Sequence, residues 1–139
     1  MTPFYAQDHD YSAFNVLAVD DIPLNLILVQ KMLSRFNFQM RTAANGQLAL
    51  DAVAAQKPDL ILLDLMMPGI DGFEVIRRLR ENPDTANIQI VILSALNSNE
   101  DIVKGFNVGA NDFIMKPIIM EKLLSCVVTQ LQIAAAKKK

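Results

Sequence analysis

The sequence predicts an α/β domain in which helices cover both faces of a parallel sheet. Five short apolar segments alternate along the chain with five segments of helical periodicity. Each connection between successive apolar segments is long enough for a crossover. The third apolar segment ends in Leu60-Ile61-Leu62-Leu63, an uninterrupted run that suits a strand buried on both faces.

The first half of the chain contributes two strands and two helices. Pro23 suits the first turn of a helix, and apolar residues at helical spacing carry that helix to about Phe36. Asn45-Gly46 punctuates the chain before the second helix. The expected elements are strands over 14–19 and 38–43 and helices over 23–36 and 47–56.

The second half contributes three strands and three helices. Asp71-Gly72 opens the third helix, and Asn82-Pro83 stops it. Gly105 lies inside the fourth helix and costs about 1 kcal/mol relative to Ala, so we expect that helix to be the least stable. The expected elements are strands over 59–63, 89–93 and 112–115, and helices over 72–81, 97–107 and 119–131.

Length and composition indicate one globular domain. The chain has 139 residues, 52% of them hydrophobic and 20% charged. We expect a loosely held extension over 1–13, whose aromatic residues could instead pack onto the domain, then the domain over 14–133 and a frayed basic tail over 134–139. His9 is interpreted as solvated, and Cys126 as a buried structural thiol.

Charge and hydropathy patterning exclude two classes of partner. The net charge of −2 gives no basic field for nucleic acid, and the three terminal lysines are too few to form such a patch. No apolar run approaches the roughly 18–20 residues of a membrane span, and the first residues lack the pattern of a signal peptide. These absences lead us to expect a cytoplasmic protein.

Five polar side chains follow the ends of four predicted strands. They are Asp20 and Asp21 after the first strand, Asp64 after the third, Ser94 after the fourth and Lys116 after the fifth. Ligands of parallel α/β sheets bind outside the carboxyl ends of the strands, so these side chains should meet. Each residue alone also fits a helix cap, a turn or a junction, but their joint placement favours a site.

The residue types indicate phosphoryl chemistry. Three carboxylates at one edge repel each other, and Mg²⁺ relieves such repulsion because it prefers oxygen ligands. Lys116 supplies a compact positive charge and Ser94 a neutral hydroxyl. A carboxylate among such groups, here Asp64, can act as a nucleophile and form an aspartyl-phosphate.

Four motifs together resemble the receiver domain of two-component response regulators, the single-domain chemotaxis-regulator fold. They are Val19-Asp20-Asp21, the segment Asp64-Leu65-Met66-Met67-Pro68-Gly69-Ile70-Asp71-Gly72, Leu93-Ser94-Ala95, and Gly109-Ala110-Asn111-Asp112-Phe113-Ile114-Met115-Lys116-Pro117. The resemblance covers roughly residues 14–133. It implies a flavodoxin-like, doubly wound sheet in the order 2-1-3-4-5, with five helices on both faces.

The resemblance also implies a role for each site residue. Asp64 is similar to the phosphoacceptor of that family, and Lys116 to its phosphate partner. The resemblance assigns Mg²⁺ to Asp20, Asp21, Asp64 and the backbone carbonyl of Met66. It assigns the switch to Ser94 and Phe113, and it makes a cis bond before Pro117 typical. The protein would then catalyse its own phosphorylation and dephosphorylation without being a classical enzyme.

The family also implies partners and a phosphoryl lifetime. A sensor histidine kinase or a histidine phosphotransfer protein would supply the phosphoryl group in a His-Asp phosphorelay. A downstream protein would bind the face made by the fourth helix, the fifth strand and the fifth helix. Met66 and Leu96 flank the route of the hydrolytic water and cannot orient it, so we expect slow self-dephosphorylation.

Other classes of protein fit the sequence less well. A haloacid-dehalogenase-type hydrolase would need an Asp at the position of Met66, and a flavodoxin would need a hydroxyl- and glycine-rich loop after the first strand. A receiver-fold module that never takes phosphate stays open as an alternative. So does a receiver cut from a hybrid kinase or a multi-domain regulator.

Overall fold

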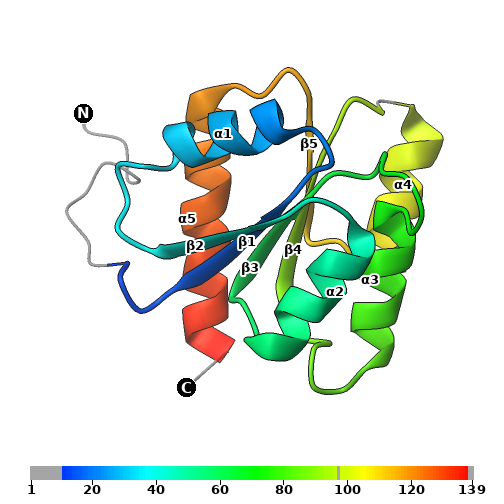
Figure 1. The fold of residues 1–139 in the computed structure, drawn as a ribbon, viewed down its shortest axis with the longest axis horizontal. Helices are drawn as coiled ribbons and strands as arrows, with labels where there is room; N and C mark the ends of the chain where they lie inside the picture. Colours follow the sequence, from blue (N-terminus) through cyan, green and yellow to red (C-terminus); the bar gives the residue numbers. More distant parts are fainter. Residues whose placement is uncertain (1–10, 97, 138–139) are drawn as a thin grey trace.

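A five-stranded parallel sheet forms the centre of the domain, in the order β2-β1-β3-β4-β5 (Figure 1). The computed structural model describes residues 11–96 and 98–137. The strands are β1 (Asn15–Val19), β2 (Gln39–Ala43), β3 (Leu60–Leu63), β4 (Gln89–Ser94) and β5 (Asp112–Met115). The helices are α1 (Pro23–Met32), α2 (Gly46–Ala55), α3 (Gly72–Glu81), α4 (Asn99–Val108) and α5 (Met120–Lys137). The predicted fold class and strand order are confirmed.

Helices cover both faces of the sheet. In Figure 1, α1 and α5 lie on one face, whereas α2, α3 and α4 lie on the other. Leu60 and Leu62 of β3 belong to the core beneath α1 and α5, and Ile61 and Leu63 to the core beneath the other three helices. Alternate side chains of one apolar run therefore supply both cores, as the pleat of a central strand requires.

The register brings the carboxyl ends of the strands together. Val19 of β1 pairs with Leu63 of β3, and Leu63 pairs with Ile92 of β4. Ser94 at the end of β4 pairs with Met115 at the end of β5. The residues that follow these strands therefore share one edge of the sheet.

Helix α1 ends at Met32, one turn before the predicted end at Phe36. The Ser34 hydroxyl donates to the Lys31 carbonyl at 2.8 Å, which offers the backbone an alternative to continuing the helix. Phe36 instead packs edge-on against Tyr11, with ring centroids 5.2 Å apart. The apolar pattern continues past the end of the helix because Phe36, which is half-buried, packs against this ring and not on a helical face.

The ordered domain is longer at both ends than predicted. Tyr11 is buried against the α1 and α5 core, so the prediction of a loose extension up to residue 13 is wrong for this residue. Helix α5 continues to Lys137, so the predicted frayed tail is wrong for 134–137. Ala134 is buried, and Lys137 donates to the Gln89 side chain, which explains why this part is helical. His9 lies outside the described residues.

Two further expectations concern single features. Cys126 is half-buried, not fully buried, and its thiol donates to Asp112 at 3.4 Å. Burial, and then the negative charge of Asp112, raise the pKa of this thiol to about 12, so it is protonated at neutral pH. None of the helices within 11–96 and 98–137 is long and apolar enough to cross a membrane.

Candidate phosphoacceptor site

Asp20 and Asp64 are positioned by the sheet itself. The backbone N–H of Asp64 donates to the Val19 carbonyl at 3.0 Å, and that of Asp20 donates to the Ala43 carbonyl at 3.2 Å. Each aspartate therefore continues the hydrogen-bond ladder one residue beyond its strand. Both residues lie at the carboxyl edge, where the sequence placed them, and both are buried.

Three carboxylates meet at this edge. One oxygen each from Asp20, Asp21 and Asp64 lies within 4.8 Å of the others. Burial raises the pKa of Asp64; Lys116 opposes this, Asp20 adds to it, and the backbone amides of Met66 and Leu65 lower it. The net rise shows that ionised Asp64 is under-compensated by the protein alone. This all-oxygen cluster fits a hard divalent cation such as Mg²⁺.

Lys116 faces the carboxylates from the end of β5. Its Nζ lies 3.0 Å from Oδ2 of Asp20 and 3.9 Å from Oδ1 of Asp64. The Lys116 N–H donates to the Ser94 carbonyl at 2.8 Å, so the ladder with β4 extends to this residue. The Lys116–Pro117 peptide bond is cis, as the resemblance implies.

The two predicted switch residues lie on neighbouring strands. Ser94 is fully buried, and its Oγ accepts from the Leu96 N–H at 3.1 Å. Phe113 is half-buried, and its ring atoms lie 3.2 and 3.5 Å from where a Cβ on Gly105 would be. Gly105 therefore lets α4 approach β4 and Phe113 closely. The sequence showed only the propensity cost of this glycine.

Met66 borders Asp64 in two ways. Its backbone amide lowers the pKa of Asp64, while its side chain is 59% exposed. With Leu96 and Phe73 it lines a shallow groove of about 430 Å³ beside the site. The carbonyl of Met66 as a metal ligand stays a prediction.

Gly72 is a site residue whose role the sequence reasoning missed. A Cβ here would lie 2.7 Å from the Asp64 carbonyl oxygen and 2.8 Å from the Leu65 Cα. The Gly72 N–H donates to the Leu65 carbonyl at 3.0 Å. Only glycine lets the start of α3 pass this close to the backbone that carries Asp64. The Asp71-Gly72 pair was the available signal, but it was interpreted as a helix start alone.

Comparison with known proteins identifies the family. The family model of the response regulator receiver domain matches residues 16–128. The chain belongs to this family. The family consists of phosphoacceptor domains and not of classical enzymes. Receiver domains interact with histidine kinases and downstream effectors, and they generally bind Mg²⁺ at an acidic cluster, the kind of cluster that the three aspartates form here.

Several curated relatives of this receiver domain are longer proteins. The chain is 44% identical over 103 residues to response regulator PleD of Caulobacter vibrioides, covering 74% of this chain and 23% of PleD. It is 36% identical over 129 residues to a probable cyclic di-GMP phosphodiesterase of Vibrio cholerae, covering 93% of this chain and 29% of that protein. It thus spans about a quarter of their length.

Solved receiver structures share the fold. The signal receiver domain of a LuxO repressor protein from Vibrio parahaemolyticus superposes with a TM-score of 0.85 at 28% identity, covering 90% of this chain and 95% of that one. Chemotaxis protein CheY4 of Vibrio cholerae superposes with a TM-score of 0.78 at 31% identity, covering 84% of this chain and 97% of that one.

Proposed function

We propose that this receiver domain accepts a phosphoryl group on Asp64 and relays the resulting change to a protein partner. One observation carries the proposal: the Asp64 carboxylate is buried beside one ammonium and two further carboxylates. A merely structural aspartate at a strand end would not need such a cluster.

The reaction is a phosphoryl transfer from a phosphohistidine. An Asp64 carboxylate oxygen forms a bond to phosphorus as the bond between phosphorus and the donor's imidazole nitrogen breaks. The electron pair of the broken bond stays on the imidazole, which then takes a proton from solvent. The product on this chain is an acyl phosphate, and no other reactant is needed.

The surrounding side chains support this step. Asp20, Asp21 and Asp64 would hold Mg²⁺, with the Met66 carbonyl as a further ligand, and the ion would supply positive charge for phosphoryl oxygens. Lys116 supplies a second positive charge from the end of β5. Its Nζ is paired with Asp20 at 3.0 Å and lies 3.9 Å from Asp64, which places it within reach of a phosphoryl oxygen on Asp64. The buried edge limits competition from water.

Ser94 and Phe113 would transmit the conformational change from Asp64 to the rest of the domain. The Ser94 Oγ accepts from the Leu96 N–H, and its own hydroxyl hydrogen can be donated to a phosphoryl oxygen. Movement of Ser94 toward the phosphoryl group makes room for the Phe113 ring, which has no hydroxyl and is held by packing alone. Phosphorylation then shifts a population between two arrangements.

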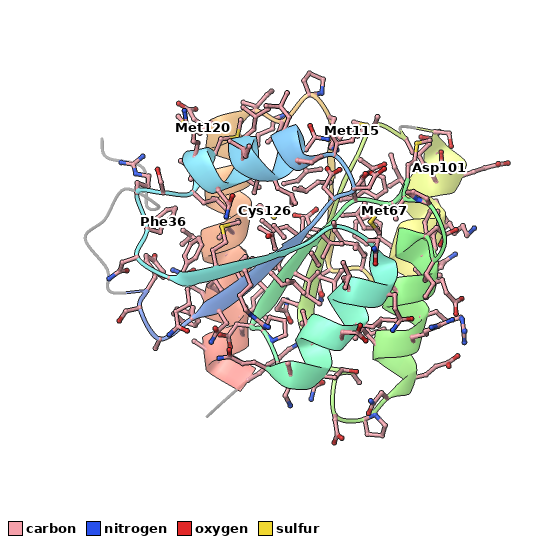
Figure 2. The ribbon with its side chains drawn as sticks, in the orientation of Figure 1. Phe36, Met67, Asp101, Met115, Met120 and Cys126 are labelled. Atoms are coloured by element: carbon pink, nitrogen blue, oxygen red, sulfur yellow. The ribbon has the colours of Figure 1, made fainter. Side chains whose placement is uncertain are left out.

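The partner-binding face in this proposal is formed by α4, β5 and α5. Large apolar side chains are exposed on each element: Val103 and Phe106 on α4, Met115 at the end of β5, and Ile119 and Met120 at the start of α5. Figure 2 shows Met115 and Met120 at the same, upper end of the molecule. Exposed apolar residues beside the switch suit a protein partner, not nucleic acid.

A sensor histidine kinase or a histidine phosphotransfer protein would be the donor. Ile22, Leu24, Ile27 and Leu28 of the α1 region are exposed apolar residues close to Asp20 and Asp21. A donor protein that brings its histidine to Asp64 would cover them, which a small-molecule donor could not do. On family grounds the proposal also places the domain in the cytoplasm.

Two features refine the proposal. Met66 and Leu96 line an apolar groove next to the loop that follows Asp64, and neither side chain can orient a water molecule, so the acyl phosphate should hydrolyse slowly. The longer curated relatives are consistent with a receiver that belongs to a hybrid kinase or a multi-domain regulator, whereas a relative covered to 93% of its length is consistent with a stand-alone regulator. A module that never takes phosphate is the alternative that the following experiment decides.

The proposal is tested by intact mass spectrometry after incubation with a small phosphodonor such as phosphoramidate. We expect a gain of one phosphoryl group in the wild type with Mg²⁺, and none with a chelator or in Asp64→Asn. Asp71→Asn is the matched control, because Asp71 is exposed in the same loop and caps α3 through its Oδ1, which an amide oxygen can replace. A wild type that gains no mass would support the phosphate-independent module.

A further inference from the structure

Arg80, at the end of α3, joins three segments at the edge of the sheet opposite Asp64. Its Nε donates to the Gly109 carbonyl at 2.9 Å. Its Nη1 donates to the carbonyls of Ala86 and Ile88 at 3.0 and 2.6 Å, and its Nη2 donates to Oδ1 of Asn111 at 2.9 Å. The planar guanidinium thus ties the α3–β4 connection to the α4–β5 connection.

The same contacts hold the C-terminal end of α4. Gly109 caps this helix at a φ of 123°, and its N–H donates to the carbonyls of Phe106 and Gly105 in the last turn. No basic residue lies in that last turn, so the Arg80 guanidinium supplies the cation that stabilises the negative end of the helix dipole. A Cβ on Gly109 would lie 2.6 Å from the Arg80 Cγ, so glycine also makes room for the arginine.

Asn111 connects the Arg80 guanidinium to β4. Its Oδ1 also accepts from the Ile90 N–H at 2.7 Å, and its own N–H donates to the Ile90 carbonyl at 2.7 Å. Arg80, Asn111 and Ile90 therefore form one hydrogen-bonded unit that includes a central strand of the sheet.

The N-terminal end of α4 has a weaker attachment. Ser98 caps it by accepting from the Asp101 N–H, a contact within the helix itself. Lys104 lies over the Phe73 ring at 4.2 Å, an exposed cation–π contact to α3. Gly105 is the only buried residue of α4, and it lies in the second half of the helix. Figure 2 places Asp101, in the first turn, at the outer end of α4.

We propose that Arg80 is a positioning residue that anchors the C-terminal end of α4. When Asp64 is phosphorylated, α4 then pivots about Gly109. The N-terminal end, which follows Ser94 by a few residues, moves, while the Gly109 end stays attached to the sheet. The pivot rests on the proposed function, whereas the anchor does not. The geometry confines the conformational change to the half of α4 that exposes Val103.

The anchor is tested without any ligand, by amide hydrogen exchange of the wild type, Arg80→Lys and Arg78→Lys. Arg80→Lys keeps the charge and loses the fork of donors, so we expect exchange at 105–111 to rise at least tenfold while β1 and β3 stay protected. Arg78→Lys is the control, because Arg78 is exposed and pairs with Glu74. Unchanged exchange at 105–111, or a uniform rise over the whole chain, would overturn the anchor.

Asn111→Ser provides a second variant if Arg80→Lys does not fold. It removes one acceptor of the same guanidinium, and we expect a smaller rise in exchange that is confined to the same segment. A folded Asn111→Ser protein with wild-type exchange at 105–111 would also contradict the anchor.

The pivot is tested by adding beryllofluoride and Mg²⁺ to the wild type as a phosphoryl mimic. We expect exchange to change at 98–104 and to stay within twofold at 105–111, and we expect the change to spread over both halves in Arg80→Lys. Equal changes in both halves of the wild type would overturn the pivot. No change anywhere, including at Asp64 and its neighbours, would overturn the proposed function and the pivot with it, while the unliganded comparison still decides the anchor.

Discussion

The Lys116 ammonium is paired with Asp20, and its Nζ lies 3.0 Å from the Asp20 Oδ2. The phosphoacceptor Asp64 is the more distant partner, at 3.9 Å from the same nitrogen. One cation is thus shared by a cluster of three carboxylates that a metal ion would also neutralise. Lys116 and Mg²⁺ therefore compete for the same negative charge.

Removal of the Lys116 ammonium should tighten Mg²⁺ binding. Two unit charges about 4 Å apart interact by about 4 kcal/mol at an effective dielectric of 20. Roughly a third of this energy corresponds to a tenfold change in the binding affinity for Mg²⁺. We expect Lys116→Ala to bind Mg²⁺ roughly tenfold more tightly in isothermal titration calorimetry. Lys104→Ala, which removes an exposed ammonium over Phe73, should leave the affinity unchanged. Weaker binding by Lys116→Ala would show that the two cations do not compete.

Ionised Asp64 should destabilise the folded protein. Because its pKa is raised, the folded state holds the proton more tightly than the unfolded chain, and stability falls as pH rises from the ordinary pKa of 3.8 through the raised value. Asp64→Asn should therefore increase the free energy of unfolding at pH 7 by about 1.4 kcal/mol for each unit of the rise.

Urea denaturation at several pH values checks this expectation. The advantage of Asp64→Asn should shrink toward zero below pH 3.8, where the wild-type carboxyl is protonated in both states. Saturating Mg²⁺ should stabilise the wild type more than the variant. An Asp64→Asn protein less stable than the wild type at pH 7 would count against an under-compensated carboxylate.

The sequence predicted which polar residues lie together at the carboxyl edge better than it predicted the helix ends. Asp20, Asp64 and Lys116 directly follow strands and Ser94 ends one, and the register of a parallel sheet brings strand ends together whatever the loops do. The end of α1 depends on the Ser34 hydroxyl, which donates to the Lys31 carbonyl and so competes with the hydrogen bonds of the helix. The spacing of apolar residues carries no information about this contact.

Contacts between distant segments were beyond the sequence. Tyr11 is buried because the Phe36 ring lies beside it, 25 positions along the chain. Lys137 is helical because Gln89 and Asn87 accept from its ammonium. Gly105 and Gly72 are required because other segments of the chain pass too close to them for a Cβ. Helix propensity scales do not include such contacts, because they count only the cost of a glycine within its own helix.

Gly105→Ala should destabilise the protein although alanine is the better helix former. The new Cβ would lie 2.8 Å from Cδ1 of Ile92 and 3.2 Å from the Phe113 ring, so α4 or the ring must move. We expect a loss of about 1–3 kcal/mol in urea denaturation, against a gain of about 1 kcal/mol from propensity alone. Asn107→Ala, on the exposed side of α4, is the control. A more stable Gly105→Ala protein would contradict the tight contact.

A polar side chain at Met66 should shorten the life of the acyl phosphate. Asn at this position can orient a water molecule toward phosphorus, and we expect Met66→Asn to hydrolyse roughly tenfold faster than the wild type. Loss of the phosphoryl mass with time, after removal of the donor, measures the rate. Ile133→Asn changes an exposed apolar residue near the far end of α5 and should match the wild type. A wild-type lifetime of only seconds would refute the slow-hydrolysis prediction.

The central claim is that Asp64 itself carries the phosphoryl group, and borohydride reduction tests it most directly. Reduction converts an aspartyl-phosphate into homoserine, which peptide mass spectrometry places at one position of the chain. After incubation with phosphoramidate and Mg²⁺, we predict homoserine at residue 64 and unmodified aspartate at 20, 21 and 71. Homoserine at another aspartate, or a phosphoryl gain that yields no homoserine, would contradict the account.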